Sequence, residues 1–269
     1  MKDKRVLYVS SEVIPYLPET EISSMSFEAP RMVNSNGGQI RIFMPRYGNI
    51  NERRHQLHEV IRLSGMNLVI NDLDMPLIIK VASIPKERMQ VYFIDNEDYF
   101  KRKATYADED GNYFEDNDER AIFFAKGVIE TVKKLNWSPD IIHVHGWLAS
   151  FLPLYLKSYY ENEPLFENSK IVTSVYNNGF NDTLNAQLID KIKFDGIENG
   201  LIEHLENPDY FNVMKTAIDH SDAVVIGSEE LSGDFDEYLK TVKKPVLKYH
   251  NKEEFSQAYL DFYQSEVLD

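Results

Sequence analysis

Short apolar runs rich in β-branched and aromatic residues alternate along the chain with segments that have the apolar spacing of a helix. The runs predict strands at 5–10, 39–44, 90–94, 140–144, 170–175 and 223–226. The helical patterns predict helices at 24–33, 119–135, 148–160, 210–220, 229–242 and 252–267. Two further runs, 68–70 and 77–81, predict an antiparallel excursion between the second strand and the third.

This alternation predicts an α/β fold with a doubly wound, mainly parallel sheet of the Rossmann-like kind, covered by helices on both faces. No linker-like stretch or internal repeat interrupts it, so we expect residues 1–269 to form a single domain. Ligands of such sheets bind beyond the carboxyl ends of the strands. That rule selects the loops that follow Ser10, Ile94, Val144, Val175 and Ile226.

Charge and cysteine content narrow the function classes. The chain has 29 Lys and Arg against 44 Asp and Glu, a net charge of -15, which repels nucleic acid, anionic membranes and free nucleotides unless a local basic pocket exists. The same charge is also typical of a surface that is merely soluble. The absence of cysteine excludes disulfides, thiolate nucleophiles and cysteine-bound metal. A charged N-terminus and the lack of a long apolar run predict a cytoplasmic protein that does not associate with membranes.

Polar side chains gather in the segments that follow the strand at 90–94. Asp, Asn, Arg and Tyr in such numbers suit a sugar, because each sugar hydroxyl both donates and accepts hydrogen bonds. Taken alone, these residues are more typical of a solvated charged loop, and the acidic spacing does not fit an EF-hand. The candidate sugar-binding residues of this region are Asp95, Asn96, Tyr99, Arg102, Asp116 and Asn117.

His143 and His145 end the next predicted strand and are followed by Trp147. Two histidines at i and i+2 lie on one face of a strand, which permits sugar contact, half of a metal site, or plain packing. No third ligand with suitable spacing is present, so we expect no metal.

Glycines and a lysine that could hold phosphates are missing from the loop after the first strand, which carries Glu19 and Glu21 instead. The chain has no P-loop, GxGxxG motif or nucleophile elbow, and we expect no cofactor.

Taken in order, several segments resemble the N-terminal domain of bacterial glycogen and plant starch synthases, which transfer glucose from ADP-glucose to an α-1,4-glucan. The resemblance covers roughly residues 5–228. Residues 6–16 are similar to the family's VLFVASEVAPF, 44–48 to its LPRYG, 95–102 to its DNPxYFxR, 106–111 to its YGDxxG, 116–120 to its DNxxRF, 139–147 to its PDVVHAHDW and 222–228 to its ADxVxTVS. It implies the Rossmann-like half of a two-domain glycosyltransferase, with the sugar-binding residues named above.

Departures from the family pattern concentrate in the donor loop, KTGGLGDV, whose Lys and glycines meet the phosphates of the nucleotide sugar. A gap-free alignment places Pro18 at the Lys, and Thr20 and Glu21 at the two glycines. The family's TIHN becomes residues 174–177, which loses the His but keeps Asn177 as a further sugar-binding candidate. In the motif that contains Trp147, Gly146 replaces the family's Asp. The resemblance also implies a second domain in which the family holds most of the nucleotide and its catalytic acidic residues, and we expect this chain to lack it.

Three functions follow from this comparison. The first is a carbohydrate-binding or regulatory domain, inactive alone, that binds an α-glucan or maltooligosaccharide. The second is a half-enzyme completed by a separate polypeptide, and the third is a structural module that contacts a partner protein. Loss of the phosphate loop favours the first function, and retention of the polar edge opposes the third.

Overall fold

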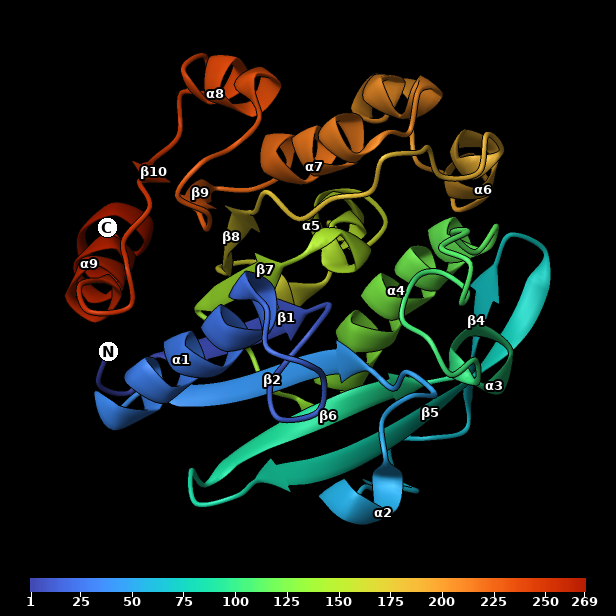
Figure 1. Cartoon of the computed structure of the whole chain (residues 1–269), viewed down its shortest axis with the longest axis horizontal. Coiled ribbons are helices and arrows are strands. Elements are labelled where there is room, and N and C mark those ends of the chain that lie inside the picture. The colour runs from blue at the N-terminus through green and yellow to red at the C-terminus, as the bar shows by residue number, and fades with distance from the viewer.

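The apolar runs form a ten-stranded sheet in the computed structural model, which describes residues 1–269 (Figure 1). The order across the sheet is β10-β9-β8-β7-β1-β2-β6-β5-β3, with β4 paired to β5 off this path. The strands are β1 (Arg5–Ser10), β2 (Gln39–Pro45), β3 (His58–Glu59), β4 (Met66–Ile70), β5 (Leu73–Ile84), β6 (Met89–Asp95), β7 (Ile141–His145), β8 (Lys170–Val175), β9 (Ala223–Ile226) and β10 (Val246–Leu247).

All strands from β10 to β6 are parallel, whereas β5 runs antiparallel to β6, β3 and β4. The predicted fold class and the antiparallel excursion are therefore confirmed. The carboxyl ends of β1, β2, β6, β7, β8 and β9 consequently meet at one edge of the sheet, which we call the carboxyl edge.

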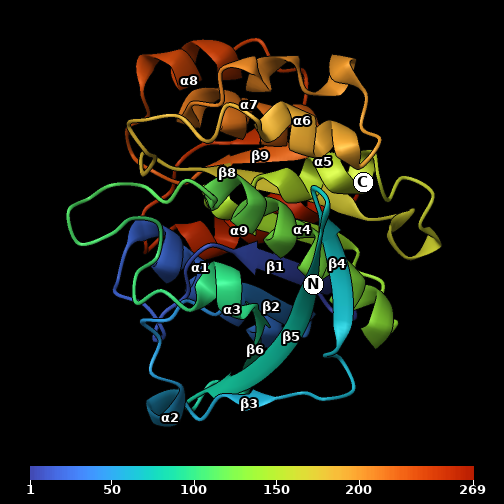
Figure 2. The ribbon, with the colours of Figure 1, turned by 90° about the vertical axis from the view of Figure 1, so that its right-hand side faces the viewer.

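Helices cover both faces of the sheet (Figures 1 and 2). The helices are α1 (Glu21–Ser35), α2 (Glu52–His55), α3 (Glu97–Phe100), α4 (Asn117–Leu135), α5 (Phe151–Lys157), α6 (Leu188–Phe194), α7 (Tyr210–Asp219), α8 (Gly233–Leu239) and α9 (Phe255–Phe262). On one face, α1 packs on β1 and β2 and contacts α9. On the other, α4 and α7 pack on the sheet with α5 between them. Helix α4 also supports the β4–β5 hairpin, which projects beside it in Figure 2.

Several helices differ from their predicted bounds. The helix predicted at 148–160 is a 3₁₀ turn, Trp147–Ala149, followed by α5, whose first turn contains Pro153. The helix predicted at 229–242 is reduced to α8. The last helix starts three residues later than predicted because Asn251 caps the preceding turn, and it ends in a π-helical turn, Tyr263–Val267.

The buried apolar residues form one continuous core, which includes the central strands, most of the apolar face of α4 and the C-terminal residues Tyr259 and Tyr263. None of the helices is both long enough and apolar enough to cross a membrane.

Candidate functional site at the carboxyl edge

The loop after β1 leads directly into a capped helix start. Thr20 is the N-cap of α1, and its Oγ1 accepts a 3.0 Å hydrogen bond from the Ser23 amide, while Ser23 Oγ accepts one of 2.8 Å from the Thr20 amide. This reciprocal pair is a capping box, in which side-chain oxygens occupy backbone donors of the first turn. A helix N-terminus binds an anion through those donors, so capping from within the chain removes part of that capacity.

Carboxylates surround the same turn. Glu19 pairs with Lys252 at 3.0 Å, and Glu21 accepts a 2.5 Å hydrogen bond from Ser228 Oγ. The pKa of Glu19 is lowered by hydrogen bonds from Lys252 and Ser24, so this side chain is ionised at neutral pH. Glu19 and Glu21 line a cavity of about 310 Å³ together with Glu28 of α1. The negative charge at this position opposes a diphosphate.

His143 and His145 are fully buried, with ring centroids 4.1 Å apart. His143 Nδ1 lies 2.5 Å from the Tyr263 hydroxyl and its Nε2 lies 2.8 Å from Ser174 Oγ, while His145 Nδ1 lies 2.7 Å from the Tyr176 hydroxyl. Burial lowers the pKa of His145 to about 3 and holds that of His143 well below its ordinary value. Both imidazoles are therefore neutral at pH 7 and act as packed hydrogen-bonding groups.

Asp95, Asn96 and Tyr99 are also buried, and each contacts other side chains or backbone groups of the protein. Asp95 forms ion pairs with Arg46 at 2.9 Å and Lys80 at 3.1 Å, joining the end of β6 to its two neighbouring strands. Asn96 Oδ1 accepts from the Tyr99 amide and caps α3. The Tyr99 hydroxyl donates to the Glu119 carboxylate over 3.0 Å.

Arg102 and Asp116 form a half-buried ion pair at 2.5 Å, and the Arg102 guanidinium carbon lies 4.1 Å from the centroid of the Phe114 ring. The neighbouring Asn117 is buried, where its amide donates to the Tyr106 carbonyl and its Oδ1 accepts from Arg120 Nη1 at 2.6 Å. Burial lowers the pKa of Arg120 to about 10, which still leaves it charged at pH 7.

Trp147 is 3% exposed and packs against Tyr106 and Phe180, with ring centroids 5.0 and 5.1 Å away. Asn177, in contrast, is exposed, and its backbone N–H donates to Ser228 Oγ. Seven of the ten predicted sugar-binding residues thus have almost no surface to offer a ligand. These are Asp95, Asn96, Tyr99, Asn117, His143, His145 and Trp147. Their role in sugar binding stays a prediction. In this structure their side chains pack inside the protein, next to the loops of the carboxyl edge.

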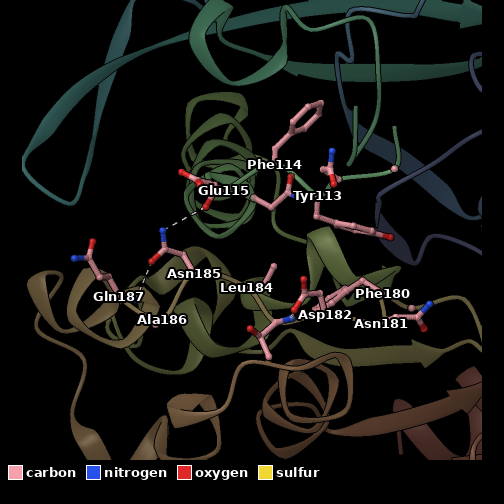
Figure 3. A pocket seen from close by; sticks show the side chains of 15 residues that line it. Tyr113, Phe114, Glu115, Phe180, Asn181, Asp182, Leu184, Asn185, Ala186 and Gln187 are labelled. Carbon is pink, nitrogen blue, oxygen red and sulfur yellow. Dashed lines mark hydrogen bonds between the residues drawn. The ribbon is translucent and has the colours of Figure 1, made fainter. Parts of the chain in front are cut away.

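An open cavity of about 770 Å³ lies at the carboxyl edge between two loops (Figure 3). Residues 111–115 and Asn117 form one wall and 179–187 form the other, and the Asn185 side-chain amide donates across to the Glu115 carbonyl at 3.5 Å. Tyr113 and Phe180 meet from the two walls with ring centroids 5.9 Å apart. Amide, carboxylate and hydroxyl side chains make up most of the remaining lining, from Asn112, Glu115, Asn181, Asp182, Thr183, Asn185 and Gln187. The buried Asn117 also lines the cavity, but both of its side-chain polar groups are bonded to the protein. We call this cavity the loop cavity.

Comparison with known proteins decides the family. The model of the starch synthase catalytic domain matches residues 5–235. The chain belongs to the starch synthase catalytic domain family. The glycogen synthase of Chlorobium phaeobacteroides is 36% identical over 227 residues, which are 84% of this chain and 46% of that protein. The glycogen synthase of Chlorobium chlorochromatii is 36% identical over 248 residues, 90% of this chain and 50% of that protein. The chain therefore spans about half the length of the curated relatives it matches.

The fold of this starch synthase-type domain agrees with that assignment. The catalytic domain of starch synthase IV from Arabidopsis thaliana, in a structure with ADP and acarbose, superposes with a TM-score of 0.74 at 17% identity, covering 93% of this chain and 52% of that chain. At this identity the likeness concerns the fold alone.

Sequence reasoning missed most of the loop cavity of this domain. The rule that ligands bind beyond strand ends selects the loop after β8, but the resemblance to the family points to only one residue of that loop, Asn177. The run Asn177-Asn178-Gly179-Phe180-Asn181-Asp182 carried a usable signal, because Asn, Asp and Gly gather there as they do in the loop before α4. Which two loops face each other depends on tertiary packing, and no local pattern reports that.

Proposed function

We propose that this starch synthase-type domain binds a neutral α-glucan or maltooligosaccharide in the loop cavity and does not use a nucleotide sugar by itself. The observation that carries the proposal is the composition of that cavity, where amide, hydroxyl and carboxylate side chains adjoin three aromatic residues. Its volume of about 770 Å³ is in the usual range for small-ligand sites, roughly 300–1,000 Å³.

The two walls supply different parts of sugar recognition. Tyr113 is 36% exposed, so its ring can cover the apolar face of a glucose unit. Asn181 and Asp182 are exposed on the opposite wall and can bond the hydroxyls at the rim of that unit. A neutral polyol also experiences no repulsion from the chain's net charge of -15.

The Arg102–Asp116 ion pair holds the loop that leads into α4, and part of that loop forms one wall of the cavity. We assign Arg102, Asp116 and the buried predicted residues to positioning of this kind. Asn177 is exposed and lies two residues before the cavity wall 179–187. Under this proposal the sugar binds between the two loops and does not contact the strands of the sheet.

Loss of donor binding rests on the start of α1. In the family's pattern, Lys and glycines stand at the positions of Pro18, Thr20 and Glu21. Here the helix start is capped by Thr20 and Ser23, and two carboxylates adjoin it. A donor phosphate would lose the lysine charge and meet repulsion instead.

Affinity electrophoresis tests the proposal with the purified chain in gels that contain glycogen. The wild type should be retarded, and Asn181→Ala should lose most of the retardation because it removes an exposed side chain of the cavity without touching the core. Asn162→Ala changes an exposed asparagine in the segment between α5 and β8 that does not line the cavity, and this variant should run like the wild type. Equal mobility of all three proteins with and without glycogen would refute glucan binding.

A further inference from the structure

A second pocket of about 440 Å³ lies at the end of the sheet opposite the carboxyl edge, between the start of β2 and the turn that joins β5 to β6. No carboxylate lines it, although the chain carries 44 acidic residues. Two arginines line it instead, Arg41 on β2 and Arg88 in the turn. In a chain with a net charge of -15, a pocket with two cations and no acid is a local reversal of charge.

Strand register places three of its polar side chains on one face. Ser83 of β5 is paired with Gln90 of β6, and the β2–β6 pairing of Ile42 with Val91 puts Arg41 level with Gln90. Side chains at level positions of paired strands point the same way. Arg41, Gln90 and Ser83 therefore form a polar row, to which Asn34 and Gln39 add further amide groups.

Arg41 is held in place by aromatic groups. Its Nη1 donates to the Tyr92 hydroxyl over 2.5 Å, and its guanidinium carbon lies 5.1 Å from the Trp137 ring centroid and 5.5 Å from that of Tyr92. Its Nε has no hydrogen-bond partner. The arginine ion pairs of the chain are formed by Arg31, Arg46 and Arg102, so both arginines of this pocket lack a carboxylate.

We propose that this pocket, which we call the arginine pocket, binds a small phosphate-bearing anion. A guanidinium presents a planar fork of donors that matches phosphate oxygens, and its immobilisation on aromatic rings lowers the entropy lost on binding. Arg88 supplies a second cation from the exposed turn. The amides and the Ser83 hydroxyl suit the hydroxyl groups of a phosphate ester.

This inference is independent of the proposed glucan site, which lies at the other end of the strands. The ligand differs too, because the loop cavity has acidic side chains and takes a neutral polyol, whereas the arginine pocket takes an anion. The pocket also lies outside the donor loop before α1.

Titration of ¹⁵N-labelled full chain by NMR tests the proposal, with inorganic phosphate, glucose 1-phosphate and glucose as separate probes. Phosphate should produce saturable shifts at the start of β2 and in the 85–90 turn. Tighter binding of glucose 1-phosphate than of phosphate would identify a phosphate ester as the preferred form, and equal binding would identify the free anion. Glucose should leave these resonances unchanged.

Arg88→Gln should weaken binding of both phosphates about tenfold, the effect of losing one charge-assisted contact. Lys86→Gln is the matched control, because it removes the same charge from an exposed residue of the same turn that does not line the pocket. It should leave affinity within about twofold of the wild type. Arg41→Lys keeps the charge but loses the planar fork, and it should also weaken binding.

Two results would overturn the proposal. One is the absence of saturable shifts with either phosphate at tens of millimolar. The other is an equal loss in Lys86→Gln and Arg88→Gln, which would show that the turn attracts anions only through diffuse charge.

Discussion

The Thr20 hydroxyl donates a 2.7 Å hydrogen bond to the Glu12 carboxylate, at the position that the family resemblance aligns with a glycine. Thr20 also accepts from the Ser23 amide, so one side chain connects the end of β1 with the first turn of α1. Glu12 receives a second hydrogen bond from the Tyr106 hydroxyl at 3.1 Å. The loop between β1 and α1 is therefore closed by side-chain contacts among Glu12, Thr20 and Ser23.

Removing the cap should cost stability. Thr20→Ala loses the N-cap oxygen and the donor to Glu12, and we expect the free energy of unfolding to fall by about 1–2 kcal/mol. Thr20→Ser keeps both bonds and should stay within about 0.5 kcal/mol of the wild type. Urea denaturation followed by circular dichroism measures the difference, and equal losses in the two variants would contradict the capping role.

Restoring the family's donor loop should restore affinity for the nucleotide. The triple variant Pro18→Lys, Thr20→Gly, Glu21→Gly recovers a lysine charge and removes a carboxylate, and glycine at an N-cap costs only a few tenths of a kcal/mol. We expect it to bind ADP at least about tenfold more tightly than the wild type. Calorimetry measures the affinity, with both proteins in an Arg88→Gln background that weakens phosphate binding at the arginine pocket. Equal affinity for ADP in the two proteins would contradict the role of this loop.

Glucosyl transfer gives a second measurement on the same loop. The purified wild type should not transfer glucose from radiolabelled ADP-glucose to glycogen, because the charge that stabilises a departing diphosphate is missing. Robust turnover in a homogeneous sample would contradict the loss of donor binding.

The buried histidines predict how stability depends on pH. The folded-state pKa of His145 is about 3, well below its ordinary value, so the unfolded chain binds a proton that the folded chain does not. The stability contribution is complete above about pH 6.5 and is lost as pH falls toward 3. Between pH 5.5 and 4.5, His145→Asn should show a slope of stability against pH that is shallower by about 1.4 kcal/mol per unit. Equal slopes would show that His145 titrates normally in the folded state.

Lys126 and Asp195 form an ion pair at 2.7 Å in which both side chains are about 5% exposed or less. Lys126→Met leaves the carboxylate with only the Tyr155 hydroxyl, so we expect a loss of about 3–5 kcal/mol of stability. Lys101→Met breaks an exposed pair with Glu97 and should cost less than about 0.5 kcal/mol. Similar effects in the two variants, measured by urea denaturation, would contradict the role of burial.

The periodicity of the sequence was sufficient to predict the sheet, because each core strand is a continuous apolar run bounded by polar residues. Strand β10 is not predicted, because its two residues, Val246 and Leu247, are too few to show a periodic pattern. The segment 148–160 predicts a continuous helix because most of its residues are apolar, whereas the chain forms a 3₁₀ turn before Pro153.

The site was less predictable than the fold. His143 is buried by Tyr263, which lies 120 residues further along the chain, and nothing local to the histidine indicates that contact. The loop cavity likewise joins residues 111–117 to 179–187, and the arginine pocket joins β2 to a distant turn. Residue types identified the polar edge, but packing determined which of its side chains reach solvent.

The most direct test of the account is an NMR titration of the ¹⁵N-labelled chain with maltoheptaose. We predict saturable shifts in residues 111–117 and 179–187 at millimolar sugar, absent in Asn181→Ala, with the buried His143 and His145 unaffected. An unchanged spectrum at millimolar maltoheptaose, or shifts confined to other surfaces, would contradict glucan binding in the loop cavity.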